Sequence, residues 1–283
     1  MSPHWLHHWR FPLWSDAAMG KDWAKGLTAA SDPRVERSAV ARRGLRYVRH
    51  MPVEQDRRLR AGWRTLPLEW SDTMAYVVGL MATDGCLSGD RRHLFFDSND
   101  RQLVEVFLTC LGRANRYRTV KTRTGNDHFQ AAFGDVDFYR WLLQVGLTPR
   151  KSLTMGAVHV PDEFIIPFAR GLFDGDGHLA NFTHAPTRVT APAYRYERLW
   201  LYFNCGSRAH LEWLRERLKT LLDLDSYLEV LKARPDKNEF YRLKLGNRAS
   251  VRMLTAFYAD QAAPRLERKW LKWNDYFNRH LLA

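Results

Sequence analysis

The feature that most constrains the fold is an internal repeat built on two apolar segments that each end in Asp-Gly. The segments are SDTMAYVVGLMATDG at residues 71–85 and PDEFIIPFARGLFDGDG at residues 161–177, and their final Asp-Gly pairs lie 92 residues apart. Both have the apolar spacing of a buried helix. A chain that contains the same unit twice is expected to fold as two related halves.

The segments that follow the two Asp-Gly pairs also correspond. Residues 96–111, FDSNDRQLVEVFLTCL, align without gaps on residues 203–218, FNCGSRAHLEWLRERL. Each reads as the end of a strand followed by a helix, which the side chain of Asp100 or Ser207 would cap.

Two strand candidates and a helix complete each half. The strands are YRTVKTR and HFQAAFG in the first half and SYLEVLKAR and EFYRLKLG in the second, and the helices are VDFYRWLLQVG and RASVRMLTAFYA. We therefore predict an α+β protein with two pseudo-symmetric αββαββα halves, at residues 71–160 and 161–283. Residues 1–70 hold six of the eleven tryptophans and many arginines. We expect them to form a mostly helical, basic extension that either presents a solvated face or adds a contact to nucleic acid.

Small residues lie at matching positions in the two apolar helices. Gly171 and Gly175 are four residues apart, and Gly79 and Thr83 occupy the same positions in the first half. Small side chains at this spacing share one helix face and let two backbones approach closely. We predict that the two helices pack against each other across a pseudo-twofold axis.

This packing would bring the acids at the two helix ends together. Acids are unfavourable at the negative end of a helix, and two carboxylates side by side raise each other's pKa. Divalent cations with oxygen ligands would relieve both problems, which makes Asp84 and Asp176 candidate metal ligands. Gly85 and Gly177 are expected to end the helices in the left-handed conformation, leaving main-chain carbonyls to help hold the metal.

Charge and cysteine content restrict the class of protein. The formal net charge is +13 and the pI is about 9.9, which favours a polyanionic partner, with nucleic acid as the first candidate. An acidic membrane surface would also fit, but no apolar run is long enough to span a bilayer. The three cysteines are scattered, with no CxxC spacing, which argues against a zinc site or a disulfide framework and predicts an intracellular, reducing compartment. The N-terminus lacks the apolar core of a secretory signal, and an organellar transit segment is the alternative.

Two motifs identify a family resemblance. VVGLMATDG at residues 77–85 and ARGLFDGDG at residues 169–177 resemble the signature motifs of the LAGLIDADG homing endonucleases. GLTPRKS at residues 146–152 and PRLERKW at residues 264–270 are also similar to that family. In the first motif Ala82 stands where an acid is common, and Thr83 replaces a smaller residue.

The resemblance implies a fold and an activity. The fold is a monomer of two αββαββα halves whose antiparallel sheets form a saddle over the major groove of double-stranded DNA. The activity is Mg²⁺-dependent cleavage of both strands at a long, non-palindromic site, as in intron homing. Asp84 and Asp176 are then the metal-binding carboxylates, and Lys151 and Lys269 are the basic catalytic residues. A bacterial cytoplasm or an organelle would be the compartment.

Basic residues on and between the predicted strands are candidates for DNA contact. Residues that alternate along a strand point to one sheet face, where Arg reads guanine and Lys neutralises phosphate. The candidates are Arg116, Arg118, Lys121, Arg123, Arg188, Arg195, Lys232, Arg242 and Lys244. The long loop at residues 178–200 would either extend this contact or have no role.

A second function from a different class uses the same scaffold. The chain would then be an RNA maturase that binds intron RNA, or a DNA-binding regulator that does not cut. Retention of Asp84 and Asp176 favours cleavage, because a protein that only binds has no need for two apposed carboxylates.

Overall fold

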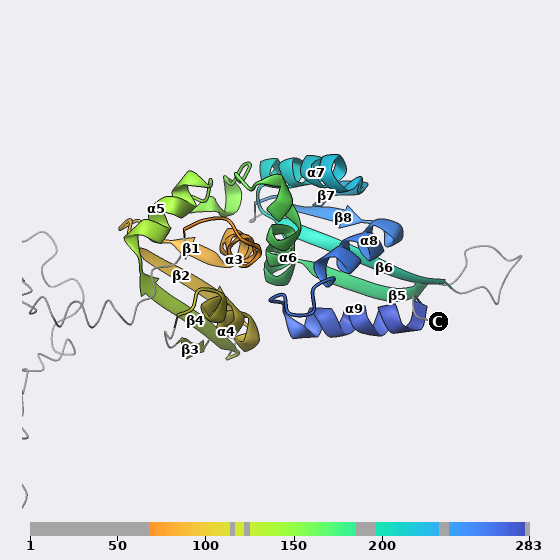
Figure 1. The fold of residues 1–283 in the computed structure, drawn as a ribbon, viewed down its shortest axis with the longest axis horizontal. Coiled ribbons are helices and arrows are strands. Elements are labelled where there is room, and N and C mark those ends of the chain that lie inside the picture. Colours follow the sequence, from red (N-terminus) through yellow and green to blue (C-terminus); the bar gives the residue numbers. More distant parts are fainter. Residues whose placement is uncertain (1–67, 114–116, 122–124, 185–195, 232–237, 281–283) are drawn as a thin grey trace, which may run out of the picture. The chain divides into compact units, whose positions relative to one another are not determined.

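A computed structural model describes residues 68–113, 117–121, 125–184, 196–231 and 238–280 (Figure 1). All of these residues belong to the compact unit Trp63–Ala283. Most of the predicted N-terminal extension, residues 1–70, lies outside the described residues.

The element order of the first half is the predicted αββαββα. Its elements are α3 (Asp72–Thr83), β1 (Gly85–Leu87), β2 (His93–Ser98), α4 (Arg101–Cys110), β3 (Arg118–Lys121), β4 (Asp127–Gly134) and α5 (Val136–Gln144). Helix α3 begins where the Ser71 side chain accepts a hydrogen bond from the Met74 amide at 3.2 Å and so caps the helix. The short helices η1 (Lys151–Leu153) and η2 (Asp162–Phe164) lie in the connection to the second half.

The second half repeats this order and adds one helix. Its elements are α6 (Ile165–Asp176), β5 (His178–His184), β6 (Tyr196–Cys205), α7 (Arg208–Leu222), β7 (Ser226–Leu231), β8 (Phe240–Leu245), α8 (Asn247–Phe257) and the additional α9 (Glu267–His280). The predicted α+β class with two αββαββα halves is therefore confirmed. Among the helices in this described part of the chain, none combines the length and the apolar character needed to cross a bilayer.

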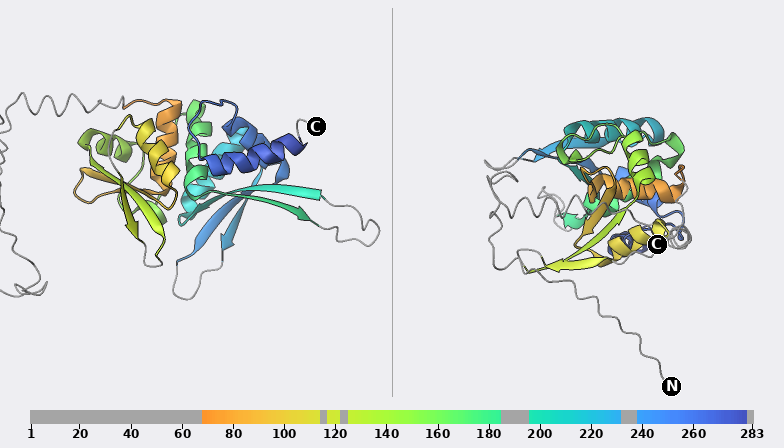
Figure 2. Two further views of the ribbon diagram at one scale, coloured as in Figure 1. Left: turned by 90° about the horizontal axis from the view of Figure 1, so that it is seen from below. Right: turned by 90° about the vertical axis from the view of Figure 1, so that its left-hand side faces the viewer.

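Each half contains one four-stranded antiparallel sheet, with strand orders β1-β2-β4-β3 and β5-β6-β8-β7. The registers correspond: Phe96 lies opposite Ala131 in the first sheet, and the matching Phe203 lies opposite Leu243 in the second. All four side chains are buried. Figure 2 (left) shows the helices of both halves on one side of the sheets, with the strands spreading away on the other. Among the described residues, one face of each sheet therefore carries no helix.

The two halves meet where α3 and α6 pack side by side (Figure 1). A Cβ atom added to Gly79 would lie 2.3 Å from the Phe168 carbonyl oxygen, and one added to Gly171 would lie 2.3 Å from the Tyr76 carbonyl oxygen. These reciprocal contacts are those of two backbones in direct contact about a pseudo-dyad. A Cβ added to Gly175 would lie 2.0 Å from Thr83 Oγ1, so the threonine side chain fills the space that this glycine leaves. The predicted helix interface is confirmed.

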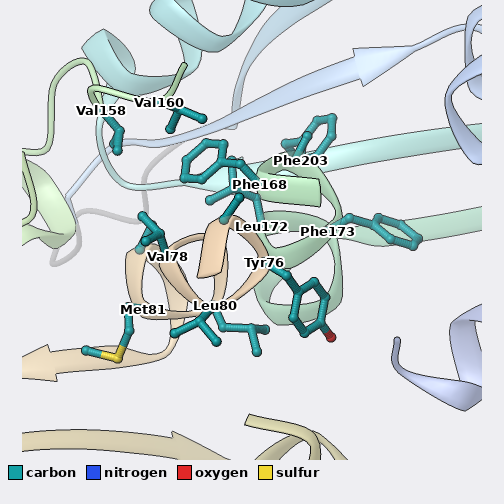
Figure 3. Packing of buried hydrophobic residues seen from close by; sticks show 14 of the residues in the cluster. Tyr76, Val78, Leu80, Met81, Val158, Val160, Phe168, Leu172, Phe173 and Phe203 are labelled. Atoms are coloured by element: carbon teal, nitrogen blue, oxygen red, sulfur yellow. The ribbon is translucent and has the colours of Figure 1, made fainter. Parts of the chain in front are cut away.

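Apolar side chains on either side of the glycine contact join the two halves into one core. Leu80 of α3 and Phe168 and Leu172 of α6 are buried, and Figure 3 shows them gathered around the two helices. The two halves therefore bury their apolar surface together.

Two details of the helix starts differ from the expectation. Asp100 and Ser207 occupy the N-cap positions of α4 and α7, but neither side chain makes a capping hydrogen bond. The Asp100 carboxylate instead accepts a hydrogen bond from Arg268 Nε at 2.8 Å, and Ser207 Oγ donates to the Met155 carbonyl oxygen. Both side chains thus connect distant segments, a use that local sequence does not reveal.

The prediction that Gly85 and Gly177 adopt the left-handed conformation is wrong. Gly177 has φ −72° and ψ 159°, which is extended backbone, and Gly85 does not have a positive φ. The chain passes straight from each helix into a strand. Glycine is required there for space, because an added Cβ would lie 2.6 Å from the Met81 backbone or 2.4 Å from the Phe173 carbonyl oxygen.

We expect Gly171→Ala to lower the free energy of unfolding by about 1–3 kcal/mol or more, because the added methyl group separates two backbones in contact. Gly89→Ala is the matched control, since nothing lies within 4 Å of its added Cβ. Urea denaturation of both variants measures the difference. Equal midpoints would contradict the close backbone contact.

Candidate functional site

The two acids that end the motif helices are brought together by the helix crossing. Asp84 is the C-cap of α3 and Asp176 is the last residue of α6. Each lies five residues after the glycine at the crossing, Gly79 or Gly171, so the pseudo-dyad places both ends side by side. The negative charge of Asp176 accordingly acts on Asp84 and raises its pKa.

The surroundings disfavour the ionised form of both carboxyl groups. Burial raises the pKa of Asp84 to about 7, and the charges of Asp176 and, more weakly, Asp97 act in the same direction. Asp176 is exposed, but the protein around it limits its hydration and raises its pKa as well. The charges of Lys269 and Lys151 oppose both shifts. The site therefore favours binding of further positive charge.

The predicted basic residues, Lys151 and Lys269, flank the acids and are 5% and 4% exposed. Lys151 Nζ donates a hydrogen bond to the Gly85 carbonyl oxygen. Lys269 Nζ donates to the carbonyl oxygens of Gly177 at 2.7 Å, Asp174 at 3.1 Å and Phe173. Burial lowers the pKa of both lysines, that of Lys269 to about 8.

These bonds revise part of the sequence interpretation. Positive charge at the negative end of each motif helix comes from a buried lysine. The carbonyls of Gly85 and Gly177 were expected to be left free, but each accepts a lysine hydrogen bond. Their role as metal ligands stays a prediction.

The two carboxylates fit a magnesium ion whose remaining ligands are phosphate oxygens or waters. Among the described residues, no side-chain hydrogen bond or ion pair engages the carboxylate oxygens of Asp84 or Asp176. Mg²⁺ is commonly held by one or two carboxylates together with phosphate oxygens and waters. The described residues contain no group of three or more His, Cys, Asp or Glu side chains that would hold a metal alone. Two unengaged carboxylates at adjacent helix ends, with the charge of Asp176 acting on Asp84, match this requirement.

The sequence interpretation did not assign Asp97 and Asn204, which lie next to the acids at corresponding positions of the two halves. Asn204 Nδ2 donates to the Asp176 carbonyl oxygen at 2.7 Å, and Arg242 Nε lies 3.2 Å from Asn204 Oδ1. In the first half the Asp97 amide donates to the Asp84 carbonyl oxygen at 3.3 Å. The gapless alignment of 96–111 on 203–218 pairs these residues, so the sequence alone could have identified them as neighbours of the acids. The two sides of the site thus differ by one carboxylate.

The described DNA-contact candidates lie on strands. Arg242 and Lys244 alternate with buried residues of β8 and so occupy the sheet face without helices. Lys244 Nζ lies 3.5 Å from the centre of the Trp200 ring. Arg118 is exposed and donates to Gln130, whereas Lys121 falls on the opposite face of β3 and pairs with Asp127 at 2.5 Å. Arg116, Arg123, Arg188, Arg195 and Lys232 lie outside the described residues.

Comparison with known proteins gives similarity in structure alone. No protein-family model and no curated protein matches the sequence. Full-length DUF199/WhiA from Thermatoga maritima is similar, with a TM-score of 0.47 and 14% identity. The match covers 76% of this chain and 63% of that one. The N-terminal LAGLIDADG domain of DUF199/WhiA has a TM-score of 0.45 at 14% identity, with 72% of this chain and 90% of that chain covered. The homing endonuclease I-DmoI, in complex with DNA and Ca, has a TM-score of 0.45 at 16% identity, with 71% and 97% covered. Similarities this low assign no function to this chain.

A buried histidine beside the site gives a testable pH dependence. His210 lines a small hollow next to Asp176, and its Nδ1–H donates to the Gly156 carbonyl oxygen at 2.9 Å. Burial lowers its pKa to about 4. Because the unfolded chain binds a proton near pH 6.5 and the folded chain does not, this group lowers stability as the pH falls from 6.5 towards 4. Between pH 7.5 and 4.5 we expect the wild type to lose about 2–3 kcal/mol more unfolding free energy than His210→Gln. Urea denaturation at both pH values measures this, and parallel losses would contradict a buried neutral histidine.

Proposed function

We propose that this chain is a site-specific endonuclease that cleaves both strands of DNA with the help of Mg²⁺. The observation that supports this most directly is the meeting of Asp84 and Asp176, with unengaged carboxylate oxygens, beside two buried lysines. The proximity of the acids raises the free energy of the folded state. Functional sites commonly contain charged groups held in such unfavourable arrangements.

In the proposed mechanism Asp84 and Asp176 would hold Mg²⁺, and each would serve the cut in one strand. Mg²⁺ held there would supply Lewis acidity, which lowers the pKa of water and stabilises charge on a phosphate. Lys151 and Lys269, fixed by bonds to helix-end carbonyls, supply positive charge that orients the phosphate and offsets charge developing on it. Both lysines are already desolvated, so little reorganisation is needed when DNA binds.

The sheet faces without helices are the proposed DNA-binding surface. Arg242 and Lys244 lie on the second of these faces, and the chain carries a formal charge of +13. The two sheets present different side chains to the same side of the molecule. A long, non-palindromic site, as in intron homing, is consistent with this difference.

A protein that binds DNA or intron RNA without cutting is the alternative. It would use the same basic surface and would retain binding when either acid is changed. It provides no reason for two acids to be apposed at the seam, so we favour the endonuclease.

We expect Asp84→Asn and Asp176→Asn each to reduce double-strand cleavage by roughly 10³-fold or more, because the carboxylate that holds the metal is lost. DNA binding should survive. The measurement is incubation with a randomised DNA library and Mg²⁺, followed by sequencing of cut ends, with an EDTA sample in parallel.

Asp72→Asn, an exposed acid in the first turn of α3, is the control and should cut normally. Full cleavage by either site variant would refute the assignment. Tight, saturable binding without cleavage by the wild type would support the binding protein instead.

We expect Lys244→Ala to weaken binding of all DNA sequences about equally and to reduce the slope of log affinity against log salt by about 1. Lys219→Ala is the control, because Lys219 lies on α7 and not on the sheet face without helices. Both lysines have carboxylate partners, Asp223 and Asp225 for Lys219 and Glu229 for Lys244. Fluorescence anisotropy at several salt concentrations measures both. An unchanged slope for Lys244→Ala would place the DNA on another surface.

A further inference from the structure

Within the described part of the chain, one buried polar contact across the seam has no counterpart on the other side of the pseudo-dyad. Asp174, two residues before Asp176, is completely buried. Its Oδ2 atom accepts a hydrogen bond from the Tyr76 hydroxyl of α3 at 2.8 Å. The same oxygen accepts a second bond from the Leu266 amide at 2.9 Å. One carboxylate oxygen therefore joins three segments that are far apart in sequence.

The third of these segments carries a proposed catalytic lysine. Leu266 immediately precedes α9, and its carbonyl oxygen accepts the Lys269 amide at 3.1 Å. The backbone at the start of α9 is thus fixed to Asp174. The ammonium group of Lys269 also donates to the Asp174 carbonyl oxygen at 3.1 Å. Burial lowers the pKa of Lys269, and the charge of Asp174 is the strongest influence that opposes this.

The first half has no equivalent of this contact. The 92-residue offset that relates the motifs places Phe168 at the position of Tyr76 and Ala82 at the position of Asp174. Neither side chain can form the bond. Lys151 accordingly sits on the short helix η1 and donates only to Gly85 among the described residues.

We propose that Asp174, held across the seam by Tyr76, is a positioning residue for Lys269 and has no such role for Lys151. The Tyr76 hydroxyl is the buried contact by which the first half acts on the placement of the second half's lysine. Gln102, which accepts from the Glu267 amide at 2.9 Å, and Asp100, which accepts from Arg268, add contacts to the start of α9 nearer the surface. The consequence for cleavage rests on the proposed endonuclease function. Lys269 bonds to the end of α6 beside Asp176, so loss of this contact slows the cut served by Asp176 and leaves the other strand's cut intact.

The first experiment does not depend on activity. The full-length chain and its Tyr76→Phe and Asp174→Asn variants are treated briefly with an amine-reactive acylating reagent, and peptides containing Lys151 and Lys269 are quantified by mass spectrometry. We expect labelling of Lys269 relative to Lys151 to rise roughly tenfold or more, because a hydrogen bond to a charged group is lost. Tyr139→Phe is the matched control, since Tyr139 is a buried tyrosine of the first half whose hydroxyl donates to the Ser88 carbonyl oxygen at 2.6 Å. It should leave the ratio unchanged.

The outcomes separate positioning from general loosening. An unchanged ratio in Tyr76→Phe, or an equal rise at both lysines, overturns the proposal. Circular dichroism shows whether Asp174→Asn still folds. If it does not, Tyr76→Phe decides the question, because it keeps the ring and removes one oxygen atom.

The second experiment measures the cut in each DNA strand separately. It uses a DNA target that the wild type cleaves, with each strand labelled at one end. Tyr76→Phe should slow one strand roughly tenfold or more while the other keeps its wild-type rate. Equal slowing of both strands overturns strand-specific positioning. Absence of cleavage by the wild type would refute the proposed function, and the labelling ratio would still decide the role of Asp174.

Discussion

The rest of the structure depends on the direct backbone contact between Gly79 and Gly171. Two helices can approach this closely only where both lack a side chain, and the added-Cβ distances of 2.3 Å leave no room for one. The contact fixes where α3 and α6 cross, and the equal spacing from each glycine to the following acid then decides that Asp84 and Asp176 meet. The two sheets extend from the same helix ends, so the contact also sets their relative arrangement.

A second constraint is electrostatic. Acids at the negative ends of two adjacent helices are unfavourable. Burial and the charge of Asp176 also raise the pKa of Asp84. Lys151 and Lys269 offset part of the cost by donating to carbonyls at those ends, without engaging the carboxylate oxygens. The acids are thereby stabilised while their oxygens stay free to bind a cation. The lysine contacts that stabilise the fold around the acids therefore also leave the proposed metal ligands available.

Much of this could be predicted because it follows from local patterns and their repetition. Helical spacing predicted α3 and α6, alternation predicted the paired strands, and the 92-residue offset predicted two equivalent halves. Small residues at i and i+4 were enough to predict which helix faces meet, since a helix surface is periodic. The two acids could be paired for the same reason. Which sheet face each basic residue occupies could not be predicted, because a shift of one residue moves a side chain such as Lys121 to the other face.

What the sequence by itself determined is therefore the repeat, the order of elements, the helix contact and the two acids. The tertiary structure alone decided that Asp174 is buried against Tyr76 and Leu266, that the lysines bond to helix-end carbonyls, and that Asp100 and Ser207 bond to distant segments instead of capping their helices. The physical reason is that a polar side chain bonds to whichever partner the packed chain brings within reach. Those partners lie tens to more than a hundred residues away, where no local pattern records them.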